Sequence, residues 1–264
     1  MTDLRSLCAD LQAEHEALDA IVAALDEVDW KLPTPADNWD VRDTVAHLCY
    51  FDETARLAVV DPSAFAAHVD DLVNGWLGRP DERLGRSTPP DELLARWRSS
   101  RAALVDAVAV LDPAARLPWY GPPMSTVSFV TARLMETWAH GQDVRDAVEA
   151  PPLVSDRLRH VCHIGVAARA YAYLVNGIDN PEAPIRVEAT APDGSLWAWG
   201  PDEAVDRVRG TALDLALVVT QRRHVADTDL AVEGPVAEQW ISIAQSFAGP
   251  AGTGRPPGLR RLTN

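Results

Sequence analysis

The stretch METWAHGQDVRDAV, from Met135 to Val148, reads as one helix and carries Glu136, His140 and Asp143 along a single ridge. Successive residues turn by about 100° on an α-helix, so side chains four apart in sequence lie one above the other. A carboxylate one turn from an imidazole can supply two ligands to one divalent cation, as paired ligands on metalloprotease helices do. The same spacing is common on solvated helices, so a metal site also needs a ligand from elsewhere in the chain.

A second stretch, from Asp40 to Val60, predicts the helix that could supply this ligand. Asp40 is placed as its N-cap, and Asp43 lies in the first turn, where the helix dipole favours a carboxylate. His47 falls at the flank of the apolar stripe, about 100° from its centre by helical-wheel counting. A flanking histidine is more often half-buried packing than a ligand, so both interpretations of His47 stay open here.

Apolar residues spaced three and four apart predict a bundle of four long helices. These helices are expected over residues 3–27, 40–60, 91–111 and 126–149, the last capped by Ser125. Residues 65–78 predict a short helix, residues 78–90 an exposed connection and residues 112–124 a proline-rich crossover. Bundle cores commonly host metal sites built from facing helices.

The composition shifts at residues 149–156, EAPPLVSD, which marks a domain boundary. Beyond it, alternating patterns predict strands over residues 184–190, 195–200, 204–210 and 228–234, and helical patterns cover 156–175 (capped near Ser155), 212–223 and 235–249. The turn PDG at Pro192–Gly194 predicts a hairpin between the first two strands. We therefore expect an all-α domain over residues 1–150, an α+β domain with an antiparallel sheet over residues 151–250, and a loose tail over residues 251–264.

Composition limits the class of function. The chain has 264 residues, is 47% hydrophobic and carries a net charge of −15 against 24 Lys and Arg. That balance argues against nucleic-acid and anionic membrane partners, because both need a concentrated basic footprint. Three scattered cysteines argue against a disulfide framework or a Cys-rich zinc site, and no signal-peptide core begins the chain. We expect a cytoplasmic protein, either monomer or homodimer.

Two N-terminal stretches together, WDVRDTVAHL (Trp39–Leu48) and ETWAHGQDV (Glu136–Val144), resemble the mycothiol-dependent maleylpyruvate isomerase family. The N-terminal domain of that family is a DinB-like four-helix bundle. LALVVTQRR (Leu215–Arg223) and DLAVEGP (Asp229–Pro235) are similar to its sterol-carrier-like C-terminal domain. The resemblance covers most of the chain, apart from residues 61–90 and the tail.

The resemblance implies that His47, Glu136 and His140 bind one divalent ion, with zinc as the expected metal. Three protein ligands leave one position open for water or substrate. Two histidines and one carboxylate can also hold iron or nickel, so the identity of the metal stays open. Asp143 could accept a hydrogen bond from His140 and orient it, or it could be an ordinary surface pairing. Cys49 points away from His47 on the helical wheel and is expected to pack rather than bind.

The family's chemistry implies mycothiol as the thiol cosubstrate, because a coordinating metal deprotonates a thiol. In the isomerase, the thiolate adds to the cis double bond of maleylpyruvate, the new single bond rotates, and elimination releases fumarylpyruvate. The same thiolate could instead attack an electrophile and stay attached, which is S-transfer. We therefore expect a mycothiol-dependent isomerase or transferase. The alternative is a metal-stabilised protein that binds a small ligand without turnover.

An anionic substrate in a protein of net charge −15 needs a local cation. The resemblance assigns this role to Arg222, at the end of a C-terminal helix. The alternative is an arginine that complements the helix dipole. Gln221 stands where many relatives have glycine, and Arg223 follows, so either arginine could be the functional one.

Overall fold

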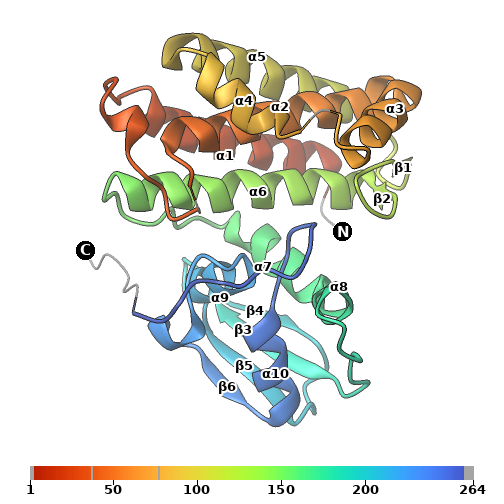
Figure 1. Cartoon of the computed structure of the whole chain (residues 1–264). Coiled ribbons are helices and arrows are strands. Elements are labelled where there is room, and N and C mark those ends of the chain that lie inside the picture. Colours follow the sequence, from red (N-terminus) through yellow and green to blue (C-terminus); the bar gives the residue numbers. More distant parts are fainter. Residues whose placement is uncertain (1–2, 37, 77, 259–264) are drawn as a thin grey trace. The chain divides into compact units, whose positions relative to one another are not determined.

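The structure is a computed structural model that describes residues 3–36, 38–76 and 78–258. The chain divides into two compact units, residues 1–151 and 152–264. Figure 1 shows that the first unit is built of helices with a small hairpin, and that the second combines helices with a larger sheet. In the described part of the chain, no helix has the length and apolar character that a membrane span requires.

The first unit is a bundle of four long helices, which confirms the predicted fold class. They are α1 (Leu4–Val22), α2 (Val41–Val60), α5 (Pro90–Val108) and α6 (Thr126–Ala147). Both α1 and α2 pack against α5 and α6. Their apolar stripes meet in a core that includes Leu18, Val45, Leu93, Trp97 and Val144. The shorter elements of this unit include η1 (Asp29–Lys31), α3 (Pro62–Val73), β1 (Arg116–Leu117) and β2 (Met124–Ser125).

The predicted caps are present at two of these helices. Asp40 Oδ1 accepts a hydrogen bond from Asp43 N at 2.8 Å, and Asp43 Oδ2 accepts one from Asp40 N at 3.4 Å, which together form a capping box. Ser125 Oγ accepts a hydrogen bond from Ser128 N at 3.1 Å. These contacts determine where α2 and α6 begin, and therefore on which turn each polar side chain lies.

The exposed connection predicted over residues 78–90 is wrong, because its middle forms the helix α4 (Pro80–Ser87). Proline in the first position and an acidic first turn favour a helix start, but the segment lacks the apolar stripe that would identify it. It packs on α2 through Gly85, where a Cβ atom would lie only 2.7 Å from Asp43 Oδ1. The missing side chain therefore lets the two helices approach closely.

A buried ion pair joins α2 to α6. Arg133 on α6 donates from Nε and Nη2 to Asp52 Oδ1 on α2, at 3.2 and 2.9 Å. Trp97 on α5 donates from Nε1 to Asp52 Oδ2 at 3.1 Å, and His15 Nε2 on α1 lies 3.6 Å from the same oxygen. Asp52 is fully buried, so residues from the other three long helices surround one carboxylate of α2 that is shielded from water.

The second unit contains a four-stranded sheet in the order β4-β3-β5-β6. On β3, Ile185, Val187 and Ala189 alternate with more exposed residues, as the pattern predicts. Helix α9 contacts β3 and β5, and α10 contacts β5 and β6. The elements are α7 (Leu158–Ala167), α8 (Arg169–Val175), β3 (Ile185–Thr190), β4 (Leu196–Trp199), β5 (Asp206–Thr211), α9 (Ala212–Val219), η2 (Val225–Asp227), β6 (Ala231–Glu233) and α10 (Pro235–Ile243).

The prediction of an antiparallel sheet holds for two of the three strand pairings and is wrong for the third. β3 pairs antiparallel with β4, and β5 with β6, but β3 and β5 run parallel with Ile185 opposite Asp206. After the hairpin, residues 200–205 pass the beginning of β3, so β5 starts at the same edge and runs in the same direction. Gly200 has a φ of +77°, and a Cβ there would clash with the carbonyl oxygen of Ile185. Pairing order is a long-range choice that strand patterns do not encode.

The first helix of this unit differs from its prediction, and the tail makes hydrogen bonds with other residues of the unit. The helix predicted over residues 156–175 is divided into α7 and α8 at Ala168, and Ser155 provides no side-chain cap. Residues 251–258 lack regular helix or strand structure, but Gly252 N donates to Gln245 Oε1 at 2.8 Å, and Gly258 N donates to the Asp227 carboxylate. Residues 259–264 of the predicted tail lie outside the described residues.

Replacing Arg133 with Met should lower the free energy of unfolding by about 3–5 kcal/mol, because it leaves the buried Asp52 carboxylate without its counter-ion. Urea denaturation measures the change. The matched control is Arg96→Met, which removes a half-exposed partner of Glu53 and should cost under about 1 kcal/mol. Equal losses in the two variants would contradict a special role for the buried pair.

Acid should destabilise the fold through His15. Burial lowers the pKa of His15 to about 4, against an attraction to Asp52 that raises it. Between pH 6.5 and 4, His15 binds a proton in the unfolded chain but not in the folded chain. The free energy of unfolding therefore falls as the pH drops, by up to about 1.4 kcal/mol per pH unit. With a chelator present, urea denaturation at pH 7 and pH 5 should show a smaller loss for His15→Leu than for the wild type. The same loss in both would exclude this contribution.

Candidate metal centre

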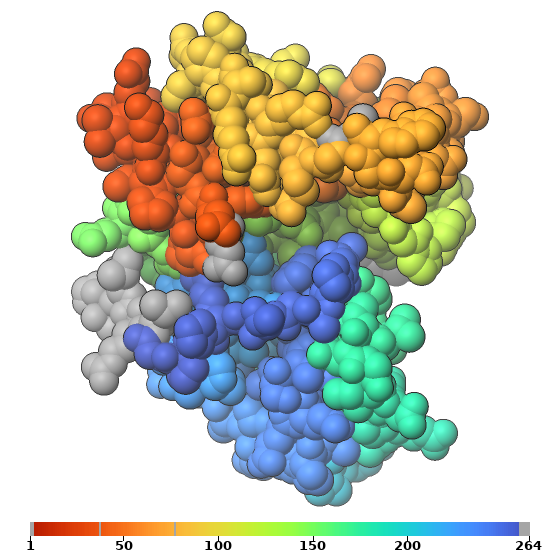
Figure 2. All heavy atoms as spheres, viewed as in Figure 1, coloured from red at the N-terminus to blue at the C-terminus, as the bar shows by residue number. Residues whose placement is uncertain are grey.

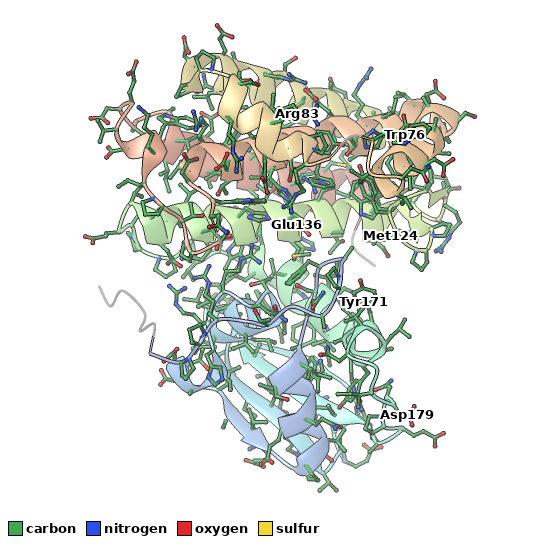
Figure 3. The ribbon with its side chains drawn as sticks, viewed as in Figure 1. Trp76, Arg83, Met124, Glu136, Tyr171 and Asp179 are labelled. Carbon is green, nitrogen blue, oxygen red and sulfur yellow. The ribbon has the colours of Figure 1, made fainter. Side chains whose placement is uncertain are left out.

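The structure brings together the three residues that the family resemblance singled out. His47 on α2 and Glu136 and His140 on α6 each offer a ligand atom, and these atoms all lie within 4.8 Å of one another. Figure 3 labels Glu136, which lies near the middle of α6. His140 is buried, and the other two are partly exposed. The helix α6 pairs Glu136 with His140 through their spacing of four residues, and packing of α2 on α6 adds His47.

Each histidine of the cluster is held by a carboxylate through the same ring nitrogen. His47 Nδ1 donates to Asp81 Oδ2 at 3.0 Å, and His140 Nδ1 lies 3.1 Å from Asp143 Oδ2. A carboxylate that accepts from Nδ1–H leaves Nε2 with its lone pair available to a metal. Asp143 is 1% exposed, so the surface-pairing interpretation of this residue is wrong.

The charge states of the cluster suit a divalent cation. Burial lowers the pKa of His47 to about 4, so its imidazole is neutral at pH 7. Burial raises the pKa of Glu136, but the imidazoles of His140 and His47, which are positively charged once protonated in acid, and the guanidinium of Arg133 outweigh burial and bring the value to about 2. Two neutral imidazoles and one carboxylate form a donor set that zinc, iron or nickel accepts.

Trp39 forms an aromatic wall against both histidines. Its ring centroid lies 4.9 Å from that of His47 and 5.8 Å from that of His140. The loop before α2 positions Trp39 through a hydrogen bond from Thr34 N to Trp39 O at 2.8 Å. The stretch from Trp39 to Leu48 thus supplies an aromatic wall, a helix cap and one histidine of the cluster within ten residues.

Phe51 links the cluster to two aromatic residues, Trp119 and Tyr120, in the crossover between α5 and α6. Its ring centroid lies 4.5 Å from that of His47 and 5.5 Å from that of Tyr120. Trp119 stacks on Phe65 with centroids 5.8 Å apart. The crossover therefore packs its aromatic rings on the same side of α2 as the phenylalanine that touches His47.

Sequence reasoning missed Asp81, which lies 34 residues beyond His47 in the segment predicted as an exposed connection. The available signal was the helix start, with Pro80 followed by two acidic residues, but nothing local indicates which histidine the carboxylate meets. Cys49 is buried, and its thiol lies 3.7 Å from Ser100 Oγ, as expected for a packing residue.

Arg222 and Arg223 follow α9 rather than belonging to it, because the helix ends at Val219. Gln221 N donates to Val218 O and Arg222 N to Leu217 O, which is the Schellman arrangement. Gln221 has a φ of +59°, which explains why glycine suits this position. The helix predicted over residues 212–223 therefore ends earlier than expected, and helical spacing does not describe the two arginines.

The surroundings of the two arginines differ. Arg222 is half-buried and donates from Nη1 to Thr220 O at 2.7 Å, a contact that caps the end of α9. Arg223 is 5% exposed and donates to the Arg222 carbonyl. A ligand in solvent can reach Arg222 more easily than Arg223.

A family profile matches most of the first unit, and relatives match nearly the whole chain. The profile of the family described as "Mycothiol maleylpyruvate isomerase N-terminal domain" matches residues 11–145. Proteins of Mycobacterium tuberculosis strains CDC 1551 / Oshkosh and ATCC 25618 / H37Rv, both described as uncharacterized, are 42% identical over 257 residues, which is 97% of this chain and 100% of each relative.

Two crystal structures of mycothiol-dependent maleylpyruvate isomerase, one of them a histidine-to-alanine variant, share the fold. They match with TM-scores of 0.58 and 0.59 at 15% identity, over 89% of this chain and 95% of theirs. The family profile spans just over half of the present chain and includes His47, Glu136 and His140. The chain therefore belongs to the mycothiol maleylpyruvate isomerase N-terminal domain family.

Proposed function

We propose that this protein is a metal-dependent, mycothiol-using enzyme that adds a thiol to a small electrophilic molecule. The observation that carries the proposal is the convergence of His47, Glu136 and His140, with both histidines held at Nδ1 by carboxylates. Surface acidic clusters lack such support, whereas metal-binding histidines nearly always have it. We assign the three residues as ligands of one divalent ion, and zinc is the metal that the donor set favours.

The residues of the centre would each have a distinct role. Asp81 and Asp143 orient the two imidazoles, and Glu136 supplies the negative ligand. Three protein ligands leave room for one exchangeable ligand, as in catalytic rather than structural zinc sites. A divalent ion held there would convert a bound thiol into a thiolate at neutral pH. Trp39 covers the two imidazoles and limits access of water from its side.

We further propose that residues 151–250 form a sterol-carrier-like domain and that Arg222 binds the carboxylate of an anionic substrate. The planar guanidinium of arginine suits two-pronged recognition of a carboxylate. The competing role of Arg222 is the capping contact with Thr220 O. Both roles are compatible with a half-buried side chain, so a functional measurement must separate them.

Turnover tests the proposed function. Zinc-loaded protein, mycothiol and maleylpyruvate should yield fumarylpyruvate if the reaction is isomerisation, whereas a stable thioether from another electrophile would indicate S-transfer. Zinc and mycothiol binding without turnover of any electrophile tried would support the binding-protein alternative, which membership of an isomerase family does not favour.

Elemental analysis of untagged protein should find about one divalent ion per chain. His140→Ala should lose it at pH 7 and keep its helical circular dichroism, because the remaining two ligands bind weakly. Acidification below about pH 4 should release the metal, since histidine binds only in its neutral form and burial lowers the pKa of His47 to about 4. The exposed His163 in the second unit provides the control, and His163→Ala should retain full occupancy. Full occupancy in His140→Ala would show that the ligands are misassigned.

Replacing Arg222 with Lys should lower kcat/KM for an anionic substrate by about ten- to a hundredfold, because a charge-assisted contact is worth about 1.5–3 kcal/mol. Zinc content and melting temperature should stay nearly unchanged. Arg223→Lys is the matched control and should affect stability more than catalysis, because Arg223 is buried. A lower melting temperature with unchanged kcat/KM in Arg222→Lys would instead support the capping role.

A further inference from the structure

We propose that α4 orients the metal centre, with Asp81 and Gly85 as positioning residues for His47. The inference deepens the proposed function, on which it rests, by assigning residues that hold a ligand without being ligands. The helix lies on the outside of the first unit, as Figure 2 shows, and Figure 3 labels Arg83 on it. The side of α4 that faces α2 contacts it at two places, one helical turn apart.

The two helices face each other through residues one turn apart on each. On α2, Asp43 and His47 are four residues apart, and on α4, Asp81 and Gly85 are also four apart. Gly85 lies against Asp43, and Asp81 lies against His47. The close contact at Gly85 therefore sets the separation of the helices at the level where Asp81 reaches the imidazole.

The hydrogen bond to Asp81 selects the tautomer of His47. A carboxylate can only accept, so the proton must reside on Nδ1, and Nε2 is left as the metal-binding nitrogen. Trp39 and Phe51 hold the plane of the ring, at centroid distances of 4.9 and 4.5 Å. Neither provides an acceptor in the ring plane, so they restrict the rotation of the imidazole without choosing its tautomer.

The space at Gly85 cannot accommodate a side chain without movement. A Cβ atom would lie 2.7 Å from Asp43 Oδ1 and 3.2 Å from Asp43 Cα and Ala46 Cβ. Asp43 also belongs to the capping box of α2, so its carboxylate is held in place. We therefore expect a methyl group at residue 85 to displace α4 and separate Asp81 from His47.

His140 provides an internal comparison. Its partner Asp143 is three residues along the same helix, so their geometry depends on α6 alone. Changes in α4 should therefore alter the tautomer of His47 and leave that of His140 as it is. A loss of folding would disturb both histidines.

The experiment compares Asp81→Ala, Asp81→Asn and Gly85→Ala in the full chain. Two controls match them: Glu82→Ala removes a neighbouring carboxylate of α4, and Gly141→Ala adds a methyl group on α6 where the nearest atoms, of Leu18, are 4.0 Å away. The readouts are the zinc dissociation constant, from competition with a chelator, and the ¹⁵N shifts of the imidazoles in zinc-free and zinc-loaded protein.

Asp81→Ala and Gly85→Ala should weaken zinc binding by about 10–100-fold. In zinc-free protein they should move His47 from the Nδ1–H to the Nε2–H tautomer, while His140 stays unchanged. Asp81→Asn should keep the Nδ1–H tautomer, because its amide oxygen still accepts, and both controls should match the wild type. Wild-type tautomer and affinity in Asp81→Ala and Gly85→Ala would overturn the proposal. A wild-type protein that binds no zinc would refute the metal site instead, and the zinc-free tautomers would still test the orienting role.

Discussion

The carboxylate of Asp52 holds the first unit together at its centre. Asp52 comes from α2, Arg133 from α6, Trp97 from α5 and His15 from α1, so one buried charge is shared among the four long helices. Burying a charge is tolerable only where its partners are correctly placed. The ion pair between α2 and α6 thus favours one arrangement of the two helices that carry the candidate ligands.

Carboxylates also hold the side chains of the candidate metal centre in place. His47 and His140 each meet a carboxylate at Nδ1, and the Glu136 carboxylate lies 3.5 Å from His140 Nε2. Polar groups are thereby paired before any cation arrives, apart from the positions that would bind it. A preorganised donor set of this kind loses little conformational entropy on binding. The contact of Asp81 with His47 also explains why α4, which contributes few apolar residues, packs against the bundle.

Local signals in the sequence were sufficient for much of the fold. The capping box at Asp40, the cap at Ser125 and the four apolar stripes predict the long helices, because caps and helical periodicity involve neighbours within about four residues. The pairing of Glu136 with His140 is predictable for the same reason. The left-handed turn at Gln221 was visible only as a departure from the family pattern, and its hydrogen bonds explain that departure.

The sequence by itself determined the four long helices and the strands of the sheet, the spacing of the ligands on α6 and, through resemblance, the family. Only the tertiary structure decided that His47 joins that pair, that Asp81 supports it and that β3 runs parallel to β5. These features join residues tens of positions apart, or strands that a third strand separates in sequence. Such contacts depend on how helices and strands pack, and glycines such as Gly85 and Gly200 permit them by allowing backbones to approach. No local pattern of residues encodes that packing.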